Sequence, residues 1–266
     1  MSQPESNSEE SVISLQNINR NFLTALQRQH DMLAFTLAGI RSSDPKAYDY
    51  FSGVSRVMPA PSVHLPHDQM VAYSRGLLLR TSMNDLLALS SECLNQCHLL
   101  CLLIKTRGRN TASTPENDRL VGEKHAEFSR MNLQDKFNAM EESFDIISDL
   151  EDSIFSIAAA LRVLVRGGLV TNDDISPDGS LTLEFKAMKD VDAPAIEPTA
   201  SGVTKNSAVP VKTTKLSDSY RTFKPGEVLE LTDEELLGLN ITVAKFFDGL
   251  FRSIDAYGRE QLGDKA

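Results

Sequence analysis

The sequence predicts an all-α protein, a helical bundle of four to five long helices with one small β-hairpin and a flexible linker before the last helix. Apolar residues recur at steps of three, four and seven along most of the chain, the spacing of a helix that buries one face. Strand-like alternation of apolar and polar residues is confined to residues 169–185. With 266 residues, 41% of them hydrophobic, the chain can bury a substantial core.

The first two helices are predicted from their apolar spacing and from the residues that end them. Residues 1–10 are expected to be a disordered N-terminus, and the first helix then extends to Ser42. Its apolar face comprises Val12, Leu15, Ile18, Phe22, Leu26, Leu33, Leu37 and Ile40. The proline-rich stretch 46–66 is expected to be an ordered loop. The second helix is predicted from Asp68 to about Thr106, and its last residues are apolar on all sides, which places them at the centre of the bundle.

Capping residues mark the next helices. Thr114 and Pro115 are typical of a helix N-terminus. A single helix from there to Val165 would measure on the order of 75 Å, so we expect a break near Met131, with Asn132 capping a further helix. Gly167-Gly168 should end that helix, as glycines do at helix C-termini.

A hairpin, a linker and a last helix complete the predicted order. The segments 169–171 and 181–185 are expected to pair around a turn at residues 176–179, so that residues 11–188 form the bundle with its terminal hairpin. Residues 189–225 are rich in Ala, Pro, Ser, Thr and Lys and predict a flexible linker. Residues 226–266 hold the last helix, which begins with a capping box at Thr232-Asp233-Glu234-Glu235. Its apolar face is too wide for solvent and must dock on the bundle or on a partner.

Composition restricts the classes of function. The formal net charge of -10 argues against a protein that coats nucleic acid, because binding to phosphates needs clustered positive charge. The N-terminal residues lack the basic and apolar parts of a secretion signal, and no apolar run approaches the roughly 18 residues that span a bilayer. We therefore expect a cytoplasmic protein that does not act at a membrane.

The three cysteines, Cys93, Cys97 and Cys101, follow one another at steps of four on one predicted helix, with His98 beside them. Each step rises about 6 Å along the helix, whereas sulfurs that share one zinc ion lie within roughly 4 to 5 Å of each other. All three cannot bind one ion, and we interpret them as small buried side chains. The sequence predicts no metal site and no cofactor.

The segment from Leu133 to Asn172 carries the one resemblance to a known family. A long helix ends in Arg166, the apolar pair Leu169-Val170 follows, and Asn172 comes soon after. This order resembles the HEPN superfamily of helical-bundle proteins, and residues 73–97 are similar to the helix that packs against it there. The resemblance implies an RNase in which a histidine transfers protons and the arginine holds the phosphate, with the motif at a dimer interface.

Two departures from the family pattern predict a non-catalytic protein. Gly167 replaces the polar residue after the arginine, and Thr171 occupies the position of the histidine. A hydroxyl that does not titrate near neutral pH cannot serve as the base. Arg166, Thr171 and Asn172 are therefore candidate binding residues. Arg119 and His125 have the spacing of an alternative catalytic pair.

A winged-helix DNA reader is the other alternative, with residues 153–165 as the recognition helix and residues 171–185 as the wing. The groove-facing residues are mostly apolar and the wing is acidic, which disfavours DNA. The sequence predicts a helical interaction or regulatory protein without catalytic activity, acting as a homodimer or with a protein partner. RNA is an alternative ligand.

Overall fold

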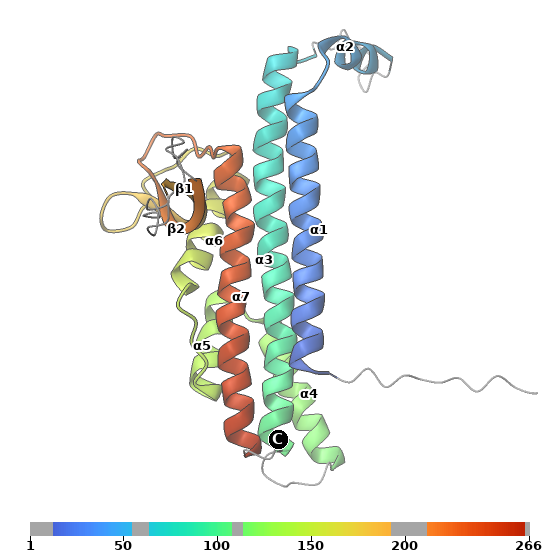
Figure 1. Ribbon diagram of the computed structural model, residues 1–266, viewed down its shortest axis with the longest axis vertical. Helices are drawn as coiled ribbons and strands as arrows, with labels where there is room; N and C mark the ends of the chain where they lie inside the picture. Colours follow the sequence, from blue (N-terminus) through green and yellow to red (C-terminus); the bar gives the residue numbers. More distant parts are fainter. Residues whose placement is uncertain (1–12, 55–63, 108–113, 193–211, 264–266) are drawn as a thin grey trace, which may run out of the picture. The chain divides into compact units, whose positions relative to one another are not determined.

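The computed structural model describes residues 13–54, 64–107, 114–192 and 212–263, and these are mostly helical, which confirms the predicted class (Figure 1). The helices are α1 (Leu15–Arg41), α2 (Pro45–Val54), α3 (His67–Arg107), α4 (Pro115–Arg130), α5 (Leu133–Phe144), α6 (Glu151–Val165) and α7 (Asp233–Leu262). Two strands, β1 (Leu181–Asp192) and β2 (Lys212–Phe223), form one antiparallel sheet.

The chain divides into two compact units. Unit 1 contains the chain up to Met32, Asn84–Glu151 and the residues from Val243 onward. Unit 2 contains Leu33–Met83 and Asp152–Thr242. The helices α1, α3 and α7 each contribute residues to both units, so each unit is assembled from segments that lie far apart in the sequence.

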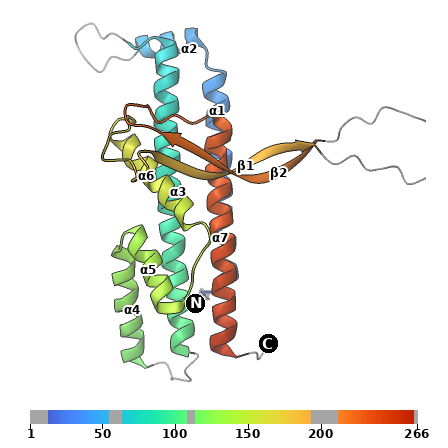
Figure 2. The same cartoon turned by 90° about the vertical axis from the view of Figure 1, so that its left-hand side faces the viewer.

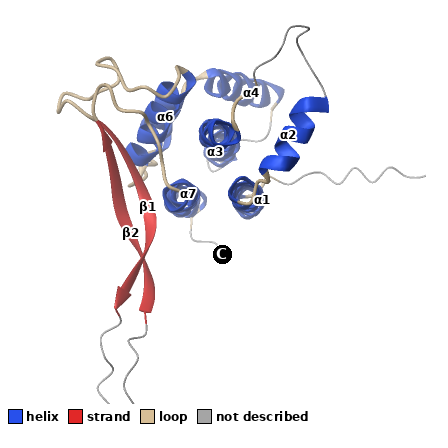
Figure 3. Ribbon diagram, turned by 90° about the horizontal axis from the view of Figure 1, so that it is seen from above, coloured by secondary structure: helices blue, strands red, loops and turns tan. Residues whose placement is uncertain are grey.

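Unit 1 is a helical bundle in which parts of α1, α3 and α7 lie side by side (Figure 3). The ring of Phe247 in α7 lies 4.2 Å from that of Phe22 in α1, and Phe246 lies 5.3 Å from Phe137 in α5, measured between ring centroids. The apolar face of α7 is buried in both units: Leu236 and Leu239 in unit 2, and Val243, Phe246, Phe247, Leu250, Phe251 and Ile254 in unit 1. The wide apolar face predicted for the last helix is therefore covered within the chain.

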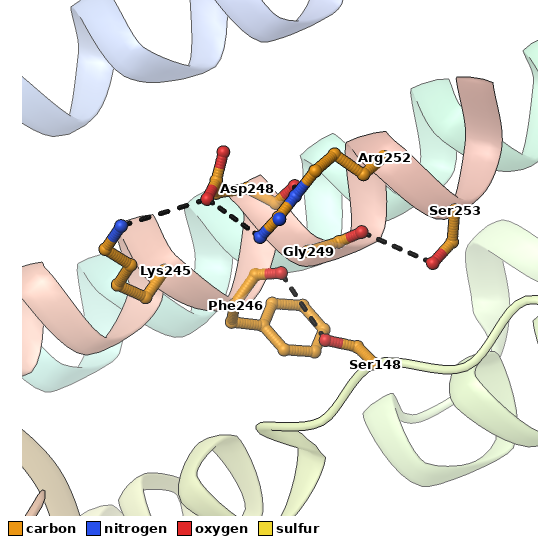
Figure 4. A network of polar contacts seen from close by, with 7 residues as sticks. All are labelled: Ser148, Lys245, Phe246, Asp248, Gly249, Arg252 and Ser253. Carbon is orange, nitrogen blue, oxygen red and sulfur yellow. Dashed lines mark hydrogen bonds and ion pairs between the residues drawn. The ribbon is translucent and has the colours of Figure 1, made fainter. Parts of the chain in front are cut away.

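The helix predicted from Asn132 to Val165 is interrupted after Phe144, and this corrects the sequence prediction. Asp145 has a left-handed backbone with φ of 57°, which ends α5. The following loop is fixed to α7: Ser148 Oγ donates to the Phe246 carbonyl at 3.4 Å, and Ser253 Oγ donates to the Ile147 carbonyl at 3.3 Å. Figure 4 shows how Ser148 reaches the backbone of α7, whose Asp248 pairs with Lys245 and Arg252.

Residues 45–54, predicted to lie in a loop, form the helix α2. The residues Ser43-Asp44-Pro45 that follow the first helix also begin the next one. The Asp44 carboxylate accepts a hydrogen bond from the Lys46 backbone N–H at 3.0 Å, and proline stands at the first helical position. The Tyr48 hydroxyl then anchors α2 by donating to the Leu65 carbonyl at 2.8 Å.

The predicted hairpin partner was wrong. β1 pairs with β2 in a register from Leu181 opposite Phe223 to Asp192 opposite Lys212, and the two strands form one twisted ribbon (Figure 2). Leu169, predicted to pair with β1, instead bridges Val228. The turn at residues 176–179 does form, with the Gly179 N–H donating to the Ser176 carbonyl at 2.9 Å.

The segment 189–225 is only partly described, and the described part differs from the predicted linker. Its first residues lie in β1, and residues 212–223 form β2, which ends at the buried Phe223. Residues 193–211 of the predicted linker, and residues 1–10 of the predicted N-terminus, lie outside the described residues.

Two further expectations meet the structure here. The winged-helix alternative needs a hairpin within residues 171–185, and this hairpin does not form, because β1 pairs with β2 instead. The expectation that no apolar stretch is long enough to cross a membrane also needs correction. Among the described helices, α3 alone is long and apolar enough to cross a membrane. A core helix of a bundle satisfies the same two criteria, and part of this stretch is buried inside the protein.

Candidate functional site

A pocket of about 750 Å³ lies within unit 2 and is the principal candidate binding site. It is lined by the end of α1, the first part of α3, the end of α6, the segment 228–232 and the start of α7. Its apolar lining includes the buried side chains of Leu37, Leu79, Leu164 and Leu236. Its volume falls within the roughly 300–1,000 Å³ typical of small-molecule sites. We call this cavity the arginine-lined pocket, after the arginines described below.

Two glycines and a capping box build the pocket wall. Gly167 and Gly168 have positive φ angles of 107° and 81°, so α6 ends and the chain turns sharply. The Leu229 N–H then donates to the Gly168 carbonyl at 2.8 Å, which holds the segment before α7 against the end of α6. Thr232 and Glu235 cap α7 reciprocally, at 3.2 and 2.8 Å, and confirm the capping box predicted from the sequence.

Arg41, Arg75, Arg80 and Arg221 line the pocket. The Asp233 carboxylate, 7% exposed, lies 2.5 Å from an Arg41 nitrogen and 2.6 Å from an Arg75 nitrogen. One buried carboxylate therefore serves two guanidinium groups, which together tie α1 and α3 to the start of α7 within unit 2.

The remaining charges lie at more exposed positions. Arg221 Nε lies 3.6 Å from a Glu235 carboxylate oxygen, and Arg80 makes no ion pair with any described residue. Glu230 and Glu234 also line the pocket. A hydrogen bond from its own backbone amide, and a second from the Thr232 hydroxyl, lower the pKa of Glu234, and Arg41 and Arg75 act in the same direction.

The residues of the HEPN-like motif meet at one carboxylate in unit 2. Arg166 forms an ion pair with Asp174. Asp174 Oδ2 also accepts the Thr171 hydroxyl at 2.7 Å and the Thr171 N–H at 3.0 Å. Arg166 and Thr171 thus both contact Asp174, a residue that was not among the predicted site residues. Asn172 is exposed in the same turn.

The alternative pair, Arg119 and His125, lies on α4 in unit 1. Arg119 is exposed and its Nε lies 3.7 Å from Glu123 in the next helical turn. The His125 ring stacks towards His98 with centroids 6.1 Å apart. Nδ1 of His125 is buried and has no hydrogen-bond partner among the described residues.

A buried polar cluster occupies the interior of unit 1. Lys136, 1% exposed, donates to Ser91 Oγ at 2.7 Å and to Asn95 Oδ1 at 2.8 Å. Burial lowers the pKa of Lys136, and the Glu92 carboxylate counteracts part of this effect. His98 stacks on Phe128 at 3.8 Å between ring centroids. Burial lowers the pKa of His98 to about 4, and the positive charges of His125, Lys124 and Lys136 act in the same direction.

Cys93, Cys97 and Cys101 are free and buried in unit 1. The hydrogen bond with Cys93, together with burial, raises the pKa of Cys97, and burial raises that of Cys101. These two thiols therefore stay protonated at neutral pH, and a protonated thiol is a poor nucleophile and metal ligand. Within the described residues, no group of three His, Cys, Asp or Glu side chains has the arrangement of a metal site.

No protein-family model, curated protein or solved structure matches the chain. The resemblance to the HEPN superfamily accordingly stays a prediction.

Sequence reasoning missed the arginines of the pocket and found their partners Asp233 and Glu235 only as members of the capping box. The four arginines come from three segments, α1, α3 and β2, that are far apart in the sequence, and no local pattern connects them. Lys136 did leave a signal, because it stands one helical turn before Met140 on the apolar face of α5.

Proposed function

We propose that the protein acts by binding, as a non-catalytic helical interaction or regulatory protein, and that the arginine-lined pocket of unit 2 is its binding site. The observation that carries this proposal is the pocket itself: a cavity of about 750 Å³ in which buried leucines stand beside several arginines. Ligand sites combine apolar walls with a few polar groups in the same way.

The test uses a neutral apolar dye, phenylnaphthylamine, whose fluorescence rises when it leaves water. Gly76 lines the pocket, and a Cβ placed on it meets no described atom within 4 Å. Gly76→Leu should therefore fill part of the pocket without a clash and weaken dye binding at least fivefold. Gly122→Leu is the matched control, because Gly122 is also helical and open but lies on α4 in unit 1. Equal binding by both variants would refute the pocket as the site.

We further propose that the protein forms a homodimer or a stable complex with a protein partner. The support comes from exposed apolar side chains of α1 and α2 in unit 2. There, α2 buries none of its residues, Phe51 is 71% exposed, and Phe35 at the end of α1 is 77% exposed. Exposed apolar surface of this kind is typical of interaction sites.

Light scattering at tens of micromolar should therefore report a mass above that of the monomer, and Phe51→Glu should lower it. Leu262→Glu, at an exposed leucine of α7, is the control that should leave the mass unchanged. If the unmodified protein is monomeric and no partner is recovered with it, this proposal is wrong.

The third element of the proposal is a degenerate HEPN-like domain with RNA as an alternative ligand. Thr171 and Arg166 both bind Asp174, which supports a site that no longer transfers protons. We expect no RNA cleavage by the unmodified protein. In Thr171→His combined with Asp174→Asn, the arginine is released and a base is restored, and a gain of metal-independent cleavage would support the family assignment.

The active-RNase alternative predicts the opposite result. RNA cleavage by the unmodified protein that survives a chelator and disappears in His125→Ala would place a catalytic site at Arg119 and His125. Arg119→Gln should then lose cleavage as well.

A further inference from the structure

We propose that the ligand of the arginine-lined pocket is a small organic anion, an amphiphile with one acidic head group and an apolar body. This inference rests on the proposed function, since it names the chemical class that the same pocket takes. It depends on the division of the pocket lining between leucines and arginines.

The apolar part of the lining selects the body of the ligand. Leu37, Leu79, Leu164 and Leu236 come from four different helices and are all buried, so their side chains are held by packing rather than by the pocket contents. Burial of an apolar body against them removes apolar surface from water and so favours binding. A purely polar ion would forgo this contribution.

The charges select the head group. Four arginines face three carboxylates in the pocket lining, an excess of positive charge in a chain whose formal net charge is -10. A guanidinium carries five N–H donors, and Asp233 engages one nitrogen of Arg41 and one of Arg75. Arg75 spends a further contact on the Leu231 carbonyl at 3.4 Å. Donors therefore remain on both side chains after Asp233 is satisfied.

Arg80 is the most suitable arginine for testing the preference of the pocket for an anion. It makes no ion pair with a described residue, so its substitution leaves no described carboxylate without a partner. Guanidinium groups bind carboxylate, sulfonate and phosphate oxygens with paired hydrogen bonds, and such charge-assisted bonds are about twice as strong as neutral ones. The acidic side chains of Glu230 and Glu234 also line the pocket and disfavour ligands with several negative charges.

Two dyes with the same anilinonaphthalene body separate the contributions of charge and apolar surface. Anilinonaphthalene sulfonate carries one negative charge, and phenylnaphthylamine carries none. We expect the sulfonate to bind at least about tenfold more tightly, since a tenfold ratio corresponds to the strength of one charged hydrogen bond. Sodium chloride should weaken the binding of the sulfonate and leave the binding of the neutral dye unchanged.

The variants assign the preference to the pocket. Arg80→Gln should lower the affinity for the sulfonate about fivefold to tenfold and change the affinity for the neutral dye by less than twofold. Gly76→Leu should lower the affinity for both dyes. Arg252→Gln is the control, since that arginine pairs with Asp248 in unit 1 and should affect neither dye. Decanoate should displace the sulfonate at lower concentrations than decanol does.

The outcomes distinguish this inference from the proposed function. Equal affinities for the two dyes, both lost in Gly76→Leu, would overturn the anionic ligand and keep the pocket as a binding site. Sulfonate binding that survives both Arg80→Gln and Gly76→Leu would overturn the inference, because the anion then binds elsewhere. Failure of the neutral dye and of the sulfonate alike would overturn the proposed function.

Discussion

At the residue scale, Asn240 is a polar side chain buried in α7 without a partner. It is 3% exposed, and neither Oδ1 nor Nδ2 makes a hydrogen bond to a described residue. A buried amide that lacks partners costs about 1–3 kcal/mol of desolvation. Replacing Asn240 with an apolar residue therefore measures this cost.

Asn240→Leu, which keeps the side-chain size, should raise the free energy of unfolding by about 1–3 kcal/mol. Urea titration followed by far-UV circular dichroism measures the change. Ser90→Ala is the contrasting variant, because the buried Ser90 hydroxyl donates to the Leu86 carbonyl at 2.7 Å. It should not stabilise the protein. Destabilisation by Asn240→Leu would show that the amide binds a group such as an ordered water.

The lowered pKa of His98 makes the stability of the protein depend on pH. Its pKa is lowered from 6.5 to about 4 in the folded protein, so the unfolded chain binds a proton between these values that the folded protein does not. The free energy of unfolding should therefore fall as the pH is lowered from about 6.5 to about 4, by an amount of up to about 3 kcal/mol.

The effect should be absent in His98→Leu and retained in His30→Gln, measured as urea midpoints at several pH values. Lys124, Lys136 and His125 lie near His98, and a similar slope in His98→Leu would show that a group other than His98 causes the pH dependence.

Residues that form hydrogen bonds with residues close to them in the sequence were predictable. Thr114, Asn132 and Thr232 cap the helices as expected, because a capping side chain binds a backbone amide three residues away. The arginines of the pocket were not predictable, since their proximity depends on the packing of distant segments. Asp174 lies between these cases: it is close in sequence to Arg166 and Thr171, but the turn that brings it to both was not foreseen.

At the element scale, β1 is joined to α7 through a close approach at Gly238. A Cβ on this glycine would lie 2.7 Å from the Lys186 carbonyl oxygen. One turn later, Thr242 accepts the Lys186 N–H at 2.8 Å and donates to the Gly238 carbonyl at 2.9 Å. On α6, Ser156 similarly accepts the Glu184 N–H at 3.0 Å. Two hydroxyls thus satisfy backbone donors of the strand that would otherwise be unpaired.

Gly238→Ala should lower the free energy of unfolding by about 2–4 kcal/mol, because the added methyl group forces the strand away from the helix. The same change at the open Gly122 of α4 should raise it by up to about 1 kcal/mol, since alanine favours a helix more than glycine does. Thermal and urea unfolding of the two variants measure the difference. Similar effects of both substitutions would contradict the close approach.

Most helices were predictable from sequence, whereas the strand pairing was not. Helical periodicity is a local property, so α3 was predicted to within a residue or two at both ends. The partner of β1 lies beyond the undescribed residues 193–211, and the composition around it resembles a linker. Helix α2 was not predicted because the stretch 46–66 is rich in proline, although proline is well suited to the first turn of a helix, where Pro45 stands.

At the scale of the whole molecule, the division into two units was not predictable, because neither unit is a continuous piece of sequence. The predicted domains were consecutive segments: a bundle, a linker and a last helix. Instead, α1, α3 and α7 are each shared, with the changes between units after Met32, Met83 and Thr242. A helical pattern extends through such a point without interruption, so periodicity carries no sign of it.

The shared helices predict that the two units unfold together. The backbone hydrogen-bond ladder of each helix continues through the residues where the units change, and helix formation is cooperative along an unbroken ladder. The chain contains no tryptophan, so a single one can report on each unit: Tyr257→Trp in unit 1 and Phe223→Trp in unit 2. After confirming by far-UV circular dichroism that each variant keeps its helix content, we expect their fluorescence and helix signals to give one coincident urea transition. Separate midpoints for the two reporters, with the helix signal following both, would show instead that the helices break between the units and that each unit folds independently.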